Sequence, residues 1–168
     1  IVLYTTRPPR QGEISGRDYF FISGAELETL RQAGKVIEVR TYQTVEGPWS
    51  YATVDDGRID LTRKDYIAIG VPESYLSIRN YFGSDRVFPL YIEVEDGERL
   101  LRALQRERLQ PKPCYAELCR RFLADEEDFS EARLRRADIT RRYENADLAA
   151  CIREIRTEIL RAEQDGQE

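Results

Sequence analysis

Alternating apolar and polar positions indicate strands along the first third of the chain, with one helical stretch among them. Residues 1–4 read as the end of a buried strand, and residues 35–42 alternate as a half-buried strand does. Between them, Ser23 offers an N-cap to a run with helical spacing that ends at Gly34. Residues 51–61 carry an Asp-Asp-Gly turn between two apolar runs, which predicts a β-hairpin.

The pattern then changes to strand, helix, strand, helix. Residues 65–71 form a short apolar run that predicts a strand buried on both faces, and a helix is expected near residues 74–82. A strand over residues 87–94 and a helix with leucines at 100, 101 and 104 follow. Apolar residues at helical spacing over 148–159 predict a final amphipathic helix that packs on the sheet. This alternation favours an α/β fold with a parallel sheet flanked by helices.

Composition narrows the class of protein. A chain of 168 residues with 41% hydrophobic and 34% charged residues suits one soluble domain. No apolar run is long enough to span a membrane and no targeting peptide is visible, so we expect a cytoplasmic protein without a membrane partner. Three cysteines without ligand spacing, and no histidine, predict no metal-ligand set. Chemistry must then rest on arginine, lysine and carboxylates, which favours phosphoryl transfer over hydrolysis.

Charge argues against one class of partner. Most of the positive charge is arginine, yet the net charge is -5. A nucleic-acid binder usually has the opposite balance, so we expect no nucleic-acid partner.

The segment from Arg7 to Arg10 is the strongest candidate for a ligand site. Two guanidinium groups flank Pro8 and Pro9, and the prolines stiffen the backbone between them. Planar recognition of a phosphate requires such forks. Taken alone, an Arg-Pro-Pro-Arg pair is more often a solvated turn, but Gly12, Gly16, Asp18 and Tyr19 follow at a spacing that favours the ligand site.

This segment, from Thr5-Thr6-Arg7-Pro8 to Tyr19-Phe20-Phe21, resembles the monophosphate-binding signature of guanylate kinases. The resemblance continues through Ile37-Glu38, residues 47–53, the helix from Arg102 to Arg106, and residues 143–148. It implies a P-loop kinase-like parallel sheet flanked by helices, with a β-rich lobe that binds a nucleoside monophosphate and a helical lid. One domain over 1–168 would then have a core (1–7 and 62–105), the lobe (8–61), a lid (106–131) and a C-terminal helix with its tail (132–168).

The resemblance also implies substrate-binding residues. Arg7, Arg10, Tyr19 and Tyr51 would hold the phosphate of GMP, and Glu13 would orient the arginines. Glu38 would read guanine, with Thr53 supporting the base. Guanine offers a ring N–H and an amino group to a carboxylate, whereas adenine presents an unprotonated ring nitrogen there. The alternative for Glu38 is an exposed strand residue.

On the donor side, the resemblance assigns catalytic roles to Arg102, Arg106 and Arg121, and a place near the adenine of ATP to Asn145. Spacing of four puts Arg102 and Arg106 on one helical face. The alternative is that these arginines, with Arg120, are surface charges that pair with Glu107, Glu117 or Asp125. The implied cofactors are ATP and Mg²⁺.

The sequence also departs from the family. It contains no Gly-x-x-x-x-Gly-Lys-Ser/Thr loop, which in guanylate kinases lies just upstream of the segment that begins at Ile1. Ala68 and Gly70 replace the family's acidic pair, and Leu3 stands where many members carry serine. We therefore expect phosphorylation of GMP or dGMP only where that loop is present. The protein is expected to be a monomer or a homodimer. The alternative is a non-catalytic module that binds a nucleotide or a phosphorylated protein segment.

Overall fold

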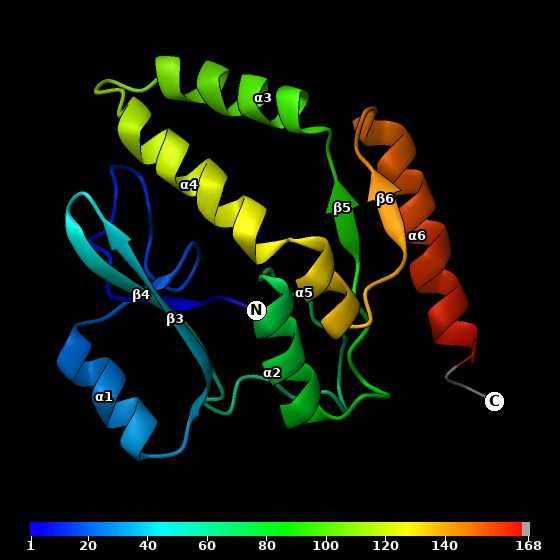
Figure 1. Cartoon of the computed structure of the whole chain (residues 1–168). Helices are drawn as coiled ribbons and strands as arrows, with labels where there is room; N and C mark the ends of the chain where they lie inside the picture. The colour runs from blue at the N-terminus through cyan, green and yellow to red at the C-terminus, as the bar shows by residue number, and fades with distance from the viewer. Residues whose placement is uncertain (166–168) are drawn as a thin grey trace. The chain divides into compact units, whose positions relative to one another are not determined.

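The computed structural model describes residues 1–165, drawn in Figure 1. The chain forms two compact units, residues 1–87 and residues 88–168. Among the described residues, no helix combines the length and the apolar character that crossing a membrane requires. The expected division into core, lobe, lid and C-terminal helix stays a prediction.

The first unit is a mixed sheet with two helices. Its strands lie in the order β2-β1-β4-β3, with β1 parallel to β2 and antiparallel to β4, and β3 antiparallel to β4. The elements are β1 (Tyr4–Thr5), β2 (Phe20–Phe21), α1 (Gly24–Gln32), β3 (Val36–Thr44), β4 (Gly47–Val54) and α2 (Pro72–Phe82).

A tight turn joins β3 to β4, and the two strands form a long hairpin (Figure 1). Thr44 pairs with Gly47, whose φ of 108° is a conformation that glycine adopts without strain. The Thr44 hydroxyl donates to the Gly47 carbonyl and accepts the Glu46 N–H. This hairpin confirms the expected strand over residues 35–42.

The core of the first unit lies between the sheet and α1. Tyr4, Ala52 and Val54 are buried, and Leu27 and Leu30 of α1 pack against them. Burial raises the pKa of Tyr4 to about 12, helped by the hydrogen bond that its hydroxyl donates to Asp56 at 2.6 Å.

The hairpin expected over residues 51–61 is wrong. Residues 51–54 belong to β4, which already pairs with β3 and β1, and the chain turns away at Asp55 and Asp56, whose carboxylates accept the N–H groups two residues ahead. The Tyr66 hydroxyl then donates to the Arg58 carbonyl and accepts the Asp60 N–H. The Arg58 carbonyl and the Asp60 N–H, which a second strand would need for pairing, therefore bond the Tyr66 hydroxyl instead.

The strand expected over residues 65–71 is also wrong. The segment has no regular structure, and Ile67 and Ile69 are 80% and 82% exposed. A strand buried on both faces needs neighbours that cover it, and residues 1–165 provide none at this segment. The helix expected after it is confirmed as α2, which begins with Pro72 in the first turn.

The second unit contains four helices and a pair of parallel strands. Its elements are β5 (Tyr91–Glu93), α3 (Asp96–Arg108), α4 (Tyr115–Asp128), α5 (Glu131–Arg136), β6 (Arg142–Glu144) and α6 (Leu148–Asp165). Tyr91 pairs with Arg142 and Glu93 with Glu144. The strand expected over residues 87–94 is thus confirmed only for its central part.

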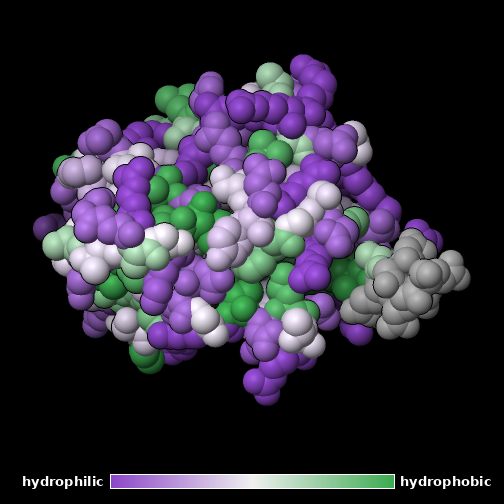
Figure 2. Space-filling model, turned by 90° about the horizontal axis from the view of Figure 1, so that it is seen from below, coloured by the Kyte–Doolittle hydropathy of each residue, from purple (hydrophilic) through white to green (hydrophobic). Residues whose placement is uncertain are grey.

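Packing in the second unit joins the helices to β6. Helices α3 and α4 contact each other, and α6 lies along β6 (Figure 1). Leu134, Tyr143 and Cys151 are almost fully buried there. The amphipathic C-terminal helix is confirmed, and Cys151 is a core residue. On the face drawn in Figure 2, hydrophilic residues predominate and hydrophobic residues lie among them, as expected for a chain that is 34% charged.

We predict that Ser23→Ala lowers the free energy of unfolding by about 1 kcal/mol. Ser23 and Glu26 form a capping box at the start of α1, in which each side chain bonds the backbone N–H of the other. Urea denaturation measures the change, and Thr29→Ala on the exposed face of the same helix is the control. Equal effects of the two substitutions would contradict the capping role.

Candidate functional site

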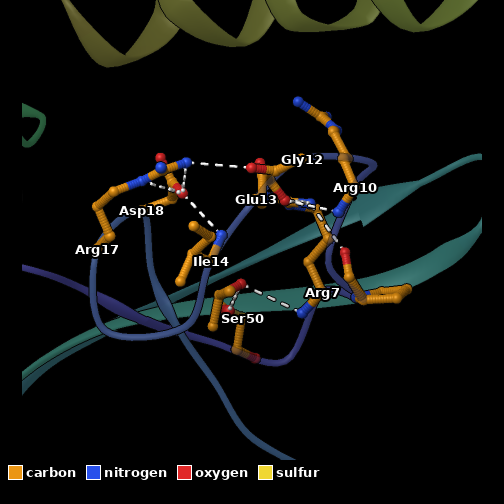
Figure 3. A network of polar contacts seen from close by, with 10 residues as sticks. Arg7, Arg10, Gly12, Glu13, Ile14, Arg17, Asp18 and Ser50 are labelled. Carbon is orange, nitrogen blue, oxygen red and sulfur yellow. Dashed lines mark hydrogen bonds and ion pairs between the residues drawn. The ribbon is translucent and has the colours of Figure 1, made fainter.

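The loop after β1 is built around an ion pair between Arg7 and Glu13. Both terminal nitrogens of Arg7 donate to the carboxylate, Nη1 to Oε2 at 2.9 Å and Nη2 to Oε1 at 2.8 Å (Figure 3). Nη1 also donates to the Pro8 carbonyl at 2.8 Å. The Arg7 side chain is only 3% exposed and Glu13 19%. A further side-chain hydrogen bond joins Arg7 to Tyr51 and contributes to the raised pKa of Arg7.

Glu13 fixes the second arginine of the motif through the backbone. Its Oε2 accepts the Arg10 N–H at 2.6 Å. The Arg10 guanidinium is exposed, extends away from the loop in Figure 3, and has no hydrogen bond or ion pair to any residue of 1–165. Glu13 therefore fixes the Arg7 side chain and the Arg10 backbone, while the Arg10 side chain is exposed. The role of Glu13 in orienting both arginines stays a prediction.

A second set of hydrogen bonds, made by Asp18 and Arg17, holds the other end of the loop. Asp18 accepts the Ile14 N–H at 2.8 Å, and Arg17 bridges Asp18 to the Gly12 carbonyl (Figure 3). Gly12 and Gly16 have φ of 85° and 84°, so the turns in this loop require glycine. The loop is held at both ends by charged hydrogen bonds.

Aromatic residues line the same region. The Arg7 guanidinium carbon lies 5.3 Å from the ring centre of Tyr19 and 5.6 Å from that of Phe21. The rings of Tyr19 and Tyr51 meet edge to face at 5.8 Å. The structure thus brings Arg7, Tyr19 and Tyr51 together, whereas Arg10 is linked to them only through its backbone bond to Glu13.

Glu38 forms a separate polar site in the same unit. A register shift in β3 lies just before it, and such irregularities re-aim side chains. The Thr53 hydroxyl donates to Glu38 Oε1 at 2.8 Å, and the Ser74 hydroxyl donates to Oε2 at 3.1 Å. The pairing of Glu38 with Thr53 agrees with their expected proximity. Ser74 is a residue that sequence reasoning missed, because it comes from α2, far along the chain.

Electrostatics keep Glu13 ionised. The hydrogen bond from Arg7 is the main reason that the pKa of Glu13 lies below its ordinary value, and the Arg10 N–H adds to the effect, while burial opposes it. Burial would by itself lower the pKa of Arg7, but Glu13 and Tyr51 together raise it. Arg7 and Glu13 are therefore both ionised at neutral pH.

The residues expected on the donor side all lie in the second unit. Arg102 donates to Glu98 at 2.7 Å, and Arg121 pairs with Glu117 at 3.4 Å and Glu107 at 3.9 Å. Arg121 therefore forms the surface ion pairs that were expected as the alternative to an ATP-binding role. Arg120 likewise donates twice to Glu117.

Two donor-side residues are not held in this way. Arg106 is exposed and makes no ion pair within residues 1–165. Asn145 follows β6, and its N–H donates to the Glu93 carbonyl at 2.8 Å. Its side chain is half-buried.

Comparison with known proteins agrees with this architecture. A crystal structure of guanylate kinase from Anaplasma phagocytophilum superposes with a TM-score of 0.64 at 24% identity, over 97% of this chain and 74% of that one. The chain therefore has the α/β, P-loop kinase-like fold of that protein. The guanylate kinase family model matches residues 1–56, which contain all seven expected substrate-binding residues.

Curated relatives agree with the family model. The guanylate kinase of Nocardia farcinica is 28% identical over 149 residues, which are 88% of this chain and 64% of that protein. The guanylate kinase of Gloeobacter violaceus is 50% identical over 38 residues, covering 23% of this chain and 18% of that protein. The chain is thus similar to guanylate kinases, and the family model matches its first third. It spans less than two thirds of the length of these relatives.

We predict that Glu13→Gln lowers the free energy of unfolding at pH 7 by about 2 kcal/mol, because it removes the charge that faces the buried Arg7. Since the pKa of Glu13 is lowered in the folded state, its contribution is present above its unfolded pKa and is lost as pH falls through the folded one. The gap between wild type and Glu13→Gln should therefore narrow in acid.

Urea denaturation between pH 7 and pH 3 measures that gap. Glu28→Gln on the exposed face of α1 is the matched control. A gap that stays constant with pH would contradict the role of the Glu13 charge.

Proposed function

We propose that this chain carries the GMP-binding half of a guanylate kinase. The observation that carries the proposal is the loop in which Glu13 binds Arg7 and the backbone of Arg10, leaving the Arg10 guanidinium exposed and without a partner in residues 1–165. An exposed guanidinium on a fixed backbone suits a phosphate dianion.

Glu38 supports guanine as the base. Each of its oxygens accepts one hydroxyl, and a carboxylate has about four lone-pair sites in all. Each oxygen can then accept one further N–H, one from the ring and one from the amino group of guanine. Adenine lacks the ring N–H at this edge, so one acceptor site of the half-buried carboxylate would face an unprotonated ring nitrogen, at a cost of about 1 to 3 kcal/mol.

The proposed reaction of the whole protein is transfer of the γ-phosphoryl group of ATP to GMP, giving ADP and GDP. It requires a phosphate-binding loop with lysine and a hydroxyl residue, which these 168 residues do not contain. Arg106 and Asn145 are the residues of this chain that fit the donor nucleotide, by charge and by the resemblance. Among residues 1–165, no three carboxylate or cysteine side chains are grouped to hold a metal ion.

We predict that Arg10→Ala weakens GMP binding about 10- to 100-fold, the equivalent of one lost charge-assisted contact to phosphate. Guanosine, which lacks the phosphate, should bind wild type and variant equally. Titration calorimetry with both ligands measures the difference, and Arg31→Ala on exposed α1 is the matched control.

Loss of guanosine binding in Arg10→Ala would show that the side chain supports the fold instead of the phosphate. A wild-type chain that binds neither GMP nor guanosine, but binds a phosphorylated peptide through Arg10, would favour the non-catalytic module.

We also predict that Glu38→Gln lowers the preference for GMP over AMP by about 10-fold or more, because the amide places a donor opposite a guanine N–H. Competition between GMP and AMP for the wild-type chain and for this variant gives the ratio. Equal affinity of the wild-type chain for the two nucleotides would contradict the role of Glu38.

A further inference from the structure

Ser74 links the Glu38 carboxylate to helix α2. Its hydroxyl donates to Oε2 at 3.1 Å, while Thr53 on β4 donates to Oε1 at 2.8 Å. The carboxylate on β3 is therefore held from two other elements, one hydroxyl to each oxygen. Two points of attachment fix the plane of the carboxylate as well as its position.

Burial separates the roles of these three side chains. Ser74 is 6% exposed and Thr53 1%, whereas Glu38 is half-buried. The hydroxyls approach the carboxylate from the protein side, where water cannot replace them without opening the packing. The open side of the carboxylate remains for a ligand, so Ser74 acts on that ligand through Glu38.

Gly70 makes room for Ser74. A Cβ at residue 70 would lie 2.9 Å from the Ser74 Cβ, a separation that real side chains do not adopt. The φ of Gly70 is not among the positive values, so the backbone itself would accept another residue. The contact with Ser74 is what requires glycine. Gly70 also stands at one of the two positions where the resemblance places an acidic pair.

We propose that Ser74 is a positioning residue for base selection, which orients the Glu38 carboxylate toward guanine in the space that Gly70 provides. This proposal rests on the proposed function, since it takes Glu38 as the group that reads the base. The Ser74 hydrogen occupies one lone pair of Oε2 and directs the remaining one to the open side. Without it, the carboxylate rotates about its bond to Cγ and the two acceptors no longer match two guanine donors.

The test is the ratio of GMP to AMP affinity in Ser74→Ala, measured by titration calorimetry. The ratio should fall about 10-fold, the size of one hydrogen bond to a charged group, with AMP affinity nearly unchanged. Ser77→Ala is the matched control, because Ser77 lies on the same helix and its hydroxyl donates to the Glu73 carbonyl. If Ser74 had only a structural role, Ser74→Ala would lower the affinity for both nucleotides to the same extent.

A double-mutant cycle gives the sharper readout. In the Glu38→Gln background, Ser74→Ala should leave the ratio unchanged, because the residue through which it acts is already altered. Gly70→Ala keeps the Ser74 hydroxyl but displaces it, so it should lower the ratio of GMP to AMP affinity as Ser74→Ala does. It replaces Ser74→Ala as the test if that variant fails to fold.

The outcomes distinguish the two proposals. A wild-type chain that prefers GMP, with the same preference in Ser74→Ala and Gly70→Ala, overturns the role of Ser74 and leaves the proposed function standing. A Ser74→Ala effect that persists in full in the Glu38→Gln background also overturns it. A wild-type chain without preference for GMP overturns both.

Discussion

The buried ion pair between Arg7 and Glu13 is the interaction on which the candidate site depends. A guanidinium that is 3% exposed must have a partner, because an unpaired buried charge is strongly destabilising. Glu13 supplies that partner through both oxygens and also accepts the Arg10 N–H. One carboxylate thus fixes the conformation of the loop, and it does so without contacting the Arg10 guanidinium. The Arg10 guanidinium, which is exposed to solvent, is therefore carried on a backbone that Glu13 already holds.

Glu38 has hydrogen-bond partners of a different kind from those of Glu13. The Thr53 and Ser74 hydroxyls that donate to Glu38 are neutral, and Glu38 makes no ion pair among residues 1–165. A carboxylate held by neutral donors keeps its full charge for a ligand, whereas the charge of Glu13 is compensated by Arg7. The two acidic side chains have different tasks for this reason: Glu13 organises cations within the protein, and Glu38 is free to attract donors from outside it.

Local signals in the sequence were sufficient for part of this structure. The cap at Ser23 predicted α1, because it depends on residues close in the chain. The resemblance implied that Glu13 orients the arginines, and Glu13 bonds the Arg7 side chain and the Arg10 backbone. The strand over 65–71 was not predictable from its apolar residues, since a strand exists only where neighbours pair with it. The false hairpin after Val54 had turn chemistry, but the Tyr66 hydroxyl takes its backbone groups. Ser74 could not be found because its contact with Glu38 spans 36 residues.

The arginines of the second unit can be compared with Arg7 on the same physical basis. Arg102 pairs with Glu98, and Arg121 pairs with Glu117; in each pair the two residues lie one helical turn apart. All four side chains are at least partly accessible to solvent. Exposed pairs of this kind contribute about 0 to 1 kcal/mol, because water competes for both charges. A phosphate group offers an arginine two parallel charge-assisted hydrogen bonds, which are stronger. Arg102 and Arg121 can therefore exchange their carboxylates for a phosphate at little cost, whereas Arg7 cannot leave Glu13. The first unit thus holds Arg7 by a buried pair, whereas the second unit holds Arg102 and Arg121 by pairs for which water competes.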